Sequence, residues 1–156
     1  MICGSPRGAT APIHAARGAS KTLLFTVRAD PTTGEMTATI AGVDSPGSGV
    51  PVDLTGAKVW FTIKNRVEDA GAIAAKRNVA AGGVDNQILV ATPQTGVSVG
   101  QFRVLLDPAD TTPLEAMTTC WCDAFVQMPG GPPINRQQVS ANRQLIIDPV
   151  VTTNFF

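Results

Sequence analysis

The stretch AKVWFTIKN, residues 57–65, alternates apolar and polar side chains and decides the fold class of this chain. Because neighbouring residues of a strand point to opposite faces, Val59, Phe61 and Ile63 share one face. The opposite face carries Lys58, Trp60, Thr62 and Lys64. One apolar face and one mostly hydrated face are typical of a strand in an antiparallel sheet or a sandwich.

Strand-like patterns recur on both sides of this stretch, separated by turns that contain glycine and proline. Within residues 21–29, Leu23, Phe25 and Val27 form one apolar face. The other expected strands are MTATIAGV (36–43), NQILVAT (86–92), GQFRVLLDP (100–108), TTCWCDAFVQM (118–128) and QQVSANRQLIID (137–148). Seven or eight short strands with such turns predict an all-β fold, an antiparallel β-sandwich.

Two segments are compatible with helix. In residues 67–83 the run AIAAK favours a helix by propensity, but its short length and flanking glycines favour a loop followed by a short strand. We expect strand-like structure that ends at Gly82–Gly83. In residues 108–117, Asp110 is a candidate cap for one helical turn with Pro113 in its first turn.

A single domain with extended ends is expected. Residues 1–19 contain glycine at three positions, proline at two and no periodicity, which predicts an extended N-terminal arm. Residues 20–149 would form the sandwich, and residues 150–156 a short C-terminal tail. The arm lacks the apolar run of a signal peptide, and no stretch reaches the roughly 20 apolar residues of a transmembrane helix. We therefore expect neither a signal peptide nor a membrane span.

Charge is balanced overall but uneven along the chain. The sequence has 12 basic and 12 acidic residues, and only 15% of its residues are charged, so no nucleic-acid or membrane partner is indicated. The exception is the first 29 residues, where Arg7, Arg17, Lys21 and Arg28 occur without a carboxylate. This segment is interpreted as a solvated tail, an arm on a neighbouring subunit or, least favoured, a nucleic-acid contact.

The cysteines indicate free thiols rather than a bridge or a metal centre. Cys120 and Cys122 occupy positions i and i+2 of one strand, where a disulfide would be strained. Cys3 lies in the expected arm, and His14 is the chain's one histidine, so a four-ligand zinc site is improbable. We expect two buried free thiols, which agrees with synthesis in a cytosol.

Catalytic constellations are not evident. A Ser/His/acid triad would have to use His14, which lies in the arm. Two carboxylate pairs, Glu68 with Asp69 and Asp107 with Asp110, are better explained as turn and cap residues than as a glycosidase pair. We therefore predict no enzyme activity, no catalytic or metal-binding residues, no cofactor and no small-molecule substrate.

The order of motifs resembles a module of tailed-phage structural proteins, the immunoglobulin-like N-terminal domain of phage baseplate upper proteins and its relatives in other virion proteins. The resemblance spans residues 52–149. The matching motifs are DLTGAKVWFTIKN (53–65), AIAAKRN (72–78), AAGGVDNQILVATPQTG (80–96), FRVLLDPADTTPL (102–114), CWCDAFVQM (120–128) and LIIDP (145–149). The segment PADTTPL, followed by a strand that contains Asp123, is the most specific part.

The resemblance implies an immunoglobulin-like sandwich and a structural role. The chain would be a non-enzymatic component of the tail, baseplate, neck or capsid surface of a phage particle, made in the host cytoplasm and located in the virion. Its partners would be copies of itself and other virion proteins. The alternative is a module that binds a host-surface glycan or receptor, for which exposed tryptophans beside polar loops would be expected.

Several residues are candidate subunit contacts. Trp60 and Trp121 are large aromatic side chains that could pack in the core, contact another subunit or stack on a sugar. Phe155 and Phe156 end the sequence, where a neighbouring chain could bury them. The contacts expected from the two ends are Arg7, Arg17, Phe155 and Phe156.

Asp123 lies inside an otherwise apolar strand. A buried carboxylate costs several kcal/mol unless it is paired or hydrogen-bonded. We therefore expect Asp123 either to face solvent or to meet an arginine or backbone donors, in a structural role.

Overall fold

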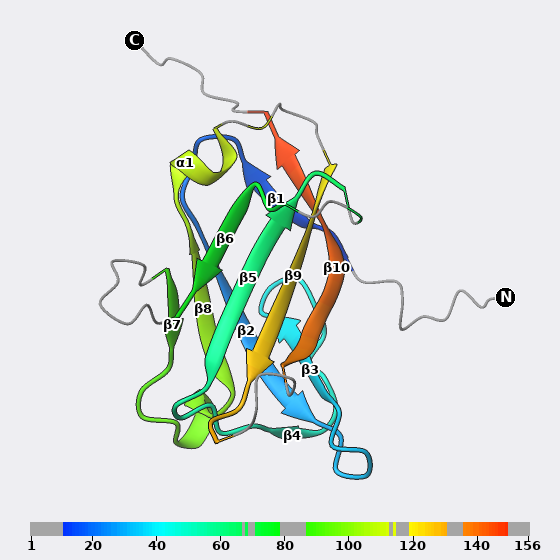
Figure 1. Cartoon of the computed structure of the whole chain (residues 1–156), viewed down its shortest axis with the longest axis vertical. Coiled ribbons are helices and arrows are strands. Elements are labelled where there is room, and N and C mark those ends of the chain that lie inside the picture. The colour runs from blue at the N-terminus through cyan, green and yellow to red at the C-terminus, as the bar shows by residue number, and fades with distance from the viewer. Residues whose placement is uncertain are drawn as a thin grey trace, which may run out of the picture.

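The computed structural model describes residues 11–66, 68, 71–78, 87–112, 114, 119–130 and 136–149, which form ten strands and one short α-helix (Figure 1). The strands are β1 (Ile13–Ala16), β2 (Lys21–Ala29), β3 (Met36–Ile40), β4 (Val50–Pro51), β5 (Lys58–Lys64), β6 (Ala74–Arg77), β7 (Ile88–Val90), β8 (Gln101–Leu106), β9 (Thr119–Gln127) and β10 (Gln137–Asp148). The helix is α1 (Pro108–Thr111), and a 3-10 turn spans Gly96–Ser98.

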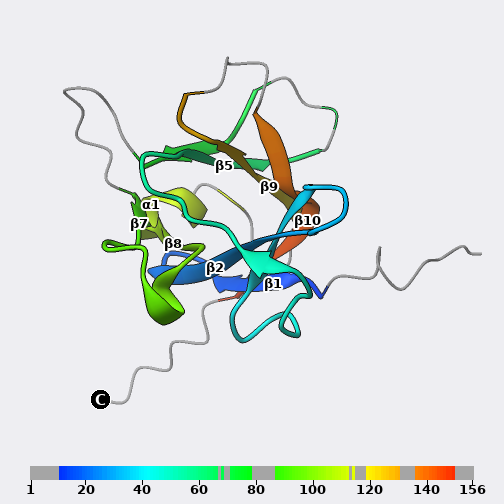
Figure 2. The same ribbon diagram turned by 90° about the horizontal axis from the view of Figure 1, so that it is seen from below.

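Two sheets pack face to face, with β5 and β9 in one layer and β2 and β8 in the other (Figure 2). Sheet A has the order β1-β10-β9-β5-β6, and sheet B has the order β3-β2-β8-β7, with β4 paired to β2. Neighbouring strands are antiparallel, except that β1 runs parallel to β10. The chain is therefore an all-β sandwich, as residues 57–65 predict.

Apolar side chains from both sheets meet in one core. Val59, Phe61 and Ile63 are buried, which confirms the alternation predicted for this strand. Phe25 of sheet B stacks on Phe102 with ring centroids 4.8 Å apart, and it meets Phe61 of sheet A edge-on at 6.1 Å. This aromatic cluster joins the two sheets through a contact that buries large apolar area.

The sheets extend into a segment that the sequence assigns to the arm. Residues 13–16 form β1, and both Ile13 and Ala15 are buried. The alternation at these two positions is too short to stand out in the sequence, and its partner β10 lies more than 100 residues away. The expected arm boundary at residue 19 is therefore wrong for residues 13–16, and residues 1–10 lie outside the described residues.

The helical turn exists, but the sequence misplaces its cap. Asp107, rather than Asp110, is the N-cap of α1, and Pro108 instead of Pro113 occupies the first turn. Asp110 lies at the third helical position, where its carboxylate accepts a hydrogen bond from the backbone N–H of Asp107 at 2.6 Å. This reciprocal arrangement is a capping box, so both carboxylates act as cap residues.

A second ambiguous segment forms a strand. Residues 74–77 become β6, which confirms the preference for strand over helix, whereas Gly82–Gly83 lie outside the described residues. On β6, Lys76 is 3% exposed, and its ammonium group pairs with the Asp110 carboxylate at 2.5 Å and donates to the Gln87 side chain. The lysine therefore fastens the edge of sheet A to the capping box of α1.

A buried ion pair fastens the other side of the sandwich. Arg143 of β10 is 4% exposed and makes two hydrogen bonds to the Asp44 carboxylate, of 2.7 and 2.8 Å. Its guanidinium also donates to the Ala11 carbonyl at 3.1 Å. Asp44 accepts a further hydrogen bond from the backbone N–H of Ile40. One arginine thus joins the last strand, the chain after β3 and the segment before β1.

The predicted absence of a membrane-spanning helix can be examined directly. Within the part of the chain that the structure describes, no helix is long and apolar enough to cross a membrane.

Candidate functional site

The solvent-facing side of sheet A gathers those aromatic residues of the described part of the chain that lie outside the core. Three cross-strand pairs of β5 and β9 form its centre: Trp60 with Phe125, Thr62 with Asp123 and Lys64 with Trp121. We call these six residues the outer face. Both tryptophans and Phe125 are partly exposed. Aromatic area of this kind on a flat sheet is typical of a surface that another molecule covers.

Basic side chains surround one end of the outer face. The Arg136 guanidinium lies over the Trp60 ring, 4.1 Å from its centroid, and Arg77 of β6 is opposite Trp60 in the register. Lys58 lies two residues before Trp60 on the same side of β5 and is exposed. We call Lys58, Trp60, Arg77 and Arg136 the basic–aromatic patch. Among the described residues, no carboxylate forms an ion pair with its three cations.

Arg136 can use its N–H groups for another partner while it remains over the Trp60 ring. A guanidinium on an aromatic ring uses its flat face for the cation–π contact, whereas its N–H groups point outward in the plane. These in-plane donors match a carboxylate in a two-point contact. The patch can therefore bind an acidic group without giving up the contact to Trp60.

Trp121 occupies the other end of the outer face. Its register neighbours are Lys64 on β5 and Gln144 on β10, and Gln144 is exposed. The two tryptophans are therefore on the same side of one sheet but at different ends of the paired strands. The structure places Trp60 and Trp121 outside the core.

Asp123 lies between these ends and is only 8% exposed. Its carboxylate accepts a hydrogen bond from the hydroxyl of Thr62, its cross-strand neighbour. Asp123 therefore lies on the outward side of the sheet, but it is buried there and does not face solvent as one of the two expectations had it. Within the described part of the chain, its hydrogen-bond partner is a threonine hydroxyl and not the arginine or backbone donors of the other expectation.

The remaining sequence-predicted contacts are not gathered on this face. Arg17 follows β1, and its guanidinium donates two hydrogen bonds to the Thr112 carbonyl, at 2.8 and 3.1 Å. It thereby ties the chain between β1 and β2 to the end of α1. Arg7, Phe155 and Phe156 lie outside the described residues.

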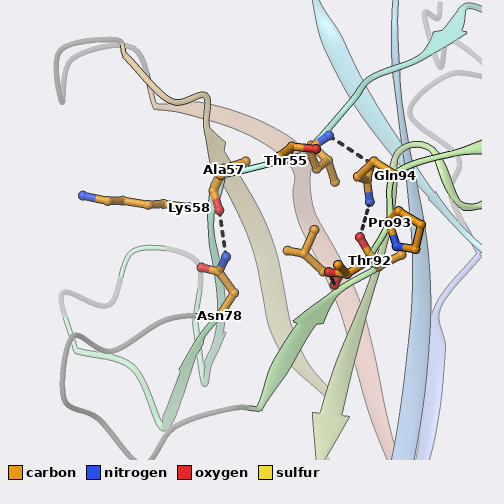
Figure 3. A pocket seen from close by; sticks show the side chains of 11 residues that line it. Thr55, Ala57, Lys58, Asn78, Thr92, Pro93 and Gln94 are labelled. Carbon is orange, nitrogen blue, oxygen red and sulfur yellow. Dashed lines mark hydrogen bonds between the residues drawn. The ribbon is translucent and has the colours of Figure 1, made fainter.

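A groove of about 510 Å³ opens between the edges of the two sheets, near the ends of β6 and β7 (Figure 3). Its apolar lining includes Leu54, Ala57, Val90 and Pro93. Lys58 borders the groove, but its side chain extends away from it (Figure 3). The groove thus offers apolar area with little charge.

The two amides in the groove are engaged in structural hydrogen bonds. The Asn78 side chain donates to the Ala57 carbonyl at 2.7 Å and accepts from the backbone N–H of Val59 at 2.9 Å. The Gln94 oxygen accepts from the backbone N–H groups of Leu54 and Gly100. Because these groups already have partners, they hold the groove's walls rather than aim at a ligand.

Catalytic and metal-binding groups do not converge in the described residues. His14 pairs with the exposed carboxylate of Asp148 at 3.1 Å, and none of the described serines is bonded to its ring. In the described part of the chain, no cluster of three or more His, Cys, Asp or Glu side chains could hold a metal ion. Glu68 is exposed in a turn, and its sequence neighbour Asp69 lies outside the described residues.

Cys120 and Cys122 are buried free thiols, as the sequence predicts. Both side chains point into the core from β9. Burial raises the pKa of the Cys122 thiol to about 12, and it also raises the pKa of Cys120. The thiolate, which is the reactive form, is therefore suppressed at neutral pH.

This burial predicts slow thiol labelling in the folded protein. In a Cys3→Ser variant at pH 8, Cys122 should react with Ellman's reagent at least about 1000-fold more slowly than an ordinary thiol, since each pKa unit changes the thiolate fraction tenfold. The same variant in urea should release both thiols for rapid reaction. Rapid labelling of Cys122 without denaturant, followed by mass spectrometry of the modified peptide, would contradict the burial of this side chain.

Sequence reasoning missed the basic part of the patch. Arg136 follows a stretch rich in glycine and proline, and nothing in that composition signals a contact with Trp60. Arg77 is in a segment whose secondary structure is ambiguous in the sequence. The alternation of residues 57–65 does predict one part of the patch, because it places Lys58 and Trp60 on the same hydrated face.

Comparison of the chain with models of protein families, with curated proteins and with solved structures finds no match.

Proposed function

We propose that this chain is a non-enzymatic structural protein of a tailed-phage particle, which assembles in multiple copies. The observation that carries the proposal is the outer face, where Trp60, Phe125 and Trp121 are partly exposed on one side of sheet A. Tryptophan is enriched at the centres of protein interfaces. The resemblance of residues 52–149 to a module of phage virion proteins supplies the kind of assembly.

The strand order supports an immunoglobulin-like version of the sandwich. In that fold one sheet contains strands C, F and G, and the other contains B, E and D. Here β5, β9 and β10 lie side by side in sheet A, and β2, β8 and β7 lie side by side in sheet B. With β2 as strand B, the sequence order gives β5, β7, β8, β9 and β10 as C, D, E, F and G.

The presence of the chain in phage particles is tested by mass spectrometry. Density-purified phage particles should contain the chain at a copy number that fits a symmetric ring or lattice. Removal of residues 1–10 and 150–156 should reduce incorporation, since both ends are proposed to contact neighbouring subunits. Absence of the chain from purified particles, or normal incorporation of the doubly truncated chain, would contradict the corresponding part of the proposal.

Loss of the tryptophans should weaken self-association. Trp60→Ala combined with Trp121→Ala should raise the dissociation constant by about 30-fold or more, because an interface tryptophan often contributes 2 kcal/mol or more. Sedimentation velocity over a concentration series measures this change. The matched control is Leu89→Ala, which removes an exposed apolar side chain of sheet B. An equal effect of the control would contradict the role of the outer face.

A glycan-binding module is the second candidate function, and the position of Trp121 favours it. This ring is partly exposed between Lys64 and Gln144, polar residues that could bond to a sugar while the ring stacks on it. Trp60 is less suited, since Arg136 already lies over its ring. Glycan arrays and host-cell binding with Trp121→Ala as control distinguish this function from assembly.

A further inference from the structure

The basic–aromatic patch has positive charge that no described residue neutralises through an ion pair. Lys58, Arg77 and Arg136 are exposed around Trp60 on sheet A. Because the whole chain has equal numbers of basic and acidic residues, the compensating carboxylates must lie elsewhere. A partner that fits this patch must offer carboxylates and some apolar area.

Such a surface exists on sheet B of the same chain. A hollow of about 590 Å³ lies beside the turn between β2 and β3, and its lining includes Asp30, Glu35 and Val50. Both carboxylates are exposed, and Val50 is 59% exposed. We call these three residues and their surroundings the acidic hollow. It combines negative charge with an apolar side chain, complementary to the patch in both respects.

One oxygen of Asp30 is committed to the turn and the other is not. The backbone N–H groups of Thr32 and Thr33 donate to Oδ1 of Asp30, at 2.7 and 3.3 Å. No hydrogen bond from a described residue reaches Oδ2. Glu35 lies at the end of the same turn, where its backbone N–H donates to the Thr33 hydroxyl and its carbonyl accepts from the backbone N–H of Asp30. No hydrogen bond from a described residue reaches its carboxylate. The hollow therefore presents two carboxylates to an incoming cation, of which that of Asp30 is held in place by the turn.

From this complementarity we infer that the basic–aromatic patch of one copy docks into the acidic hollow of a second copy of this chain. The inference rests on the proposed multi-copy assembly and names the contact that would build it. The guanidinium edges of Arg136 and Arg77 meet Glu35 and Asp30, and Trp60 covers Val50. Complementary charge fixes the register of such an interface, and the buried apolar area holds it.

The contact joins two different surfaces, so it is heterologous. Each copy can bind one neighbour through its basic–aromatic patch and a second neighbour through its acidic hollow. Repetition of this contact gives a closed ring or an open filament. A self-complementary contact between two outer faces would instead stop at a dimer. It would also oppose like charges.

Two charge-reversal variants test this arrangement, each in the full chain. The patch variant is Arg77→Glu with Arg136→Glu, and the hollow variant is Glu35→Lys. Asp30 is left unchanged because its side chain holds the turn. Each variant alone should self-associate at least about tenfold more weakly than the unaltered chain, measured by sedimentation velocity.

Mixing the two variants is the decisive measurement. The intact patch of the hollow variant can bind the intact hollow of the patch variant, so the mixture should form a heterodimer through this contact with the original affinity. The matched control is Arg103→Glu, which reverses an exposed arginine of β8 on sheet B and should leave association unchanged. Circular dichroism should show the same fold for all variants.

Three results would overturn the inference: a chain that stays monomeric at millimolar concentration, variants that associate normally, or a mixture that fails to form heterodimer. Its failure is separable from that of the proposed function. If the chain is present in particles but the patch variant is incorporated normally, the particle role holds and this contact is wrong. If the variants form a heterodimer but particles lack the chain, the contact holds and the phage role is wrong.

Discussion

Replacement of Phe25 by alanine is expected to lower the free energy of unfolding by about 3–5 kcal/mol, the usual cost of removing a buried phenylalanine. Phe25 is 1% exposed, stacks on Phe102 and meets Phe61 of the opposite sheet. Loss of the ring removes the aromatic contact between the sheets and leaves a cavity at their interface. Urea unfolding followed by tryptophan fluorescence measures the change.

The control for this variant lies three residues earlier on the same strand. Thr22 is exposed on the opposite side of β2, and Thr22→Ala should change the free energy of unfolding by less than about 1 kcal/mol. If Phe25→Ala costs no more than Thr22→Ala, the ring does not join the two sheets as the structure places it.

Replacement of Arg143 by methionine is expected to lower the free energy of unfolding by about 3–5 kcal/mol. Methionine retains much of the apolar stem of the arginine but leaves the Asp44 carboxylate, whose side chain is only 11% exposed, without its cation. The Ala11 carbonyl loses a hydrogen bond in the same variant. Denaturant unfolding gives the cost, and hydrogen exchange at residues 13–16 should show faster opening of β1.

We expect this loss of stability because Arg143 is buried and paired. The same substitution at an exposed arginine therefore provides the control. Arg103→Met at the exposed side of β8 should lower the free energy of unfolding by less than about 1 kcal/mol. A loss below 1 kcal/mol for Arg143→Met would mean that solvent, rather than Arg143, compensates the charge of Asp44.

Strands with regular alternation were predictable, because burial of one face leaves a pattern within a few neighbouring residues. Residues 57–65 and 21–29 show this pattern, and both form strands with the expected inward faces. The pairing of Arg143 with Asp44 leaves no such pattern, since the two are 99 residues apart. A charged residue in an expected strand gives no indication of which distant loop will meet it.

In the candidate site, too, features that depend on neighbouring residues were predictable, whereas contacts between distant residues were not. The sequence places Trp60 on the hydrated side of its strand, but whether Trp121 shares that side depends on the register between β5 and β9. The position of Arg136 over Trp60 is a further long-range contact, between residues 76 positions apart in the sequence. Hence the residue types of the outer face were predictable from the sequence, whereas their arrangement was not.

The parallel pairing of β1 with β10 determines how the domain bears mechanical force. The pairs run from Ile13 with Leu145 to Ala16 with Asp148, so the chain enters at one end of this ladder and leaves at the other. Tension applied through residues before Ile13 and after Asp148 pulls the two strands past each other along their length. All the hydrogen bonds of the ladder then resist together in shear, instead of opening one by one as in a peeled hairpin.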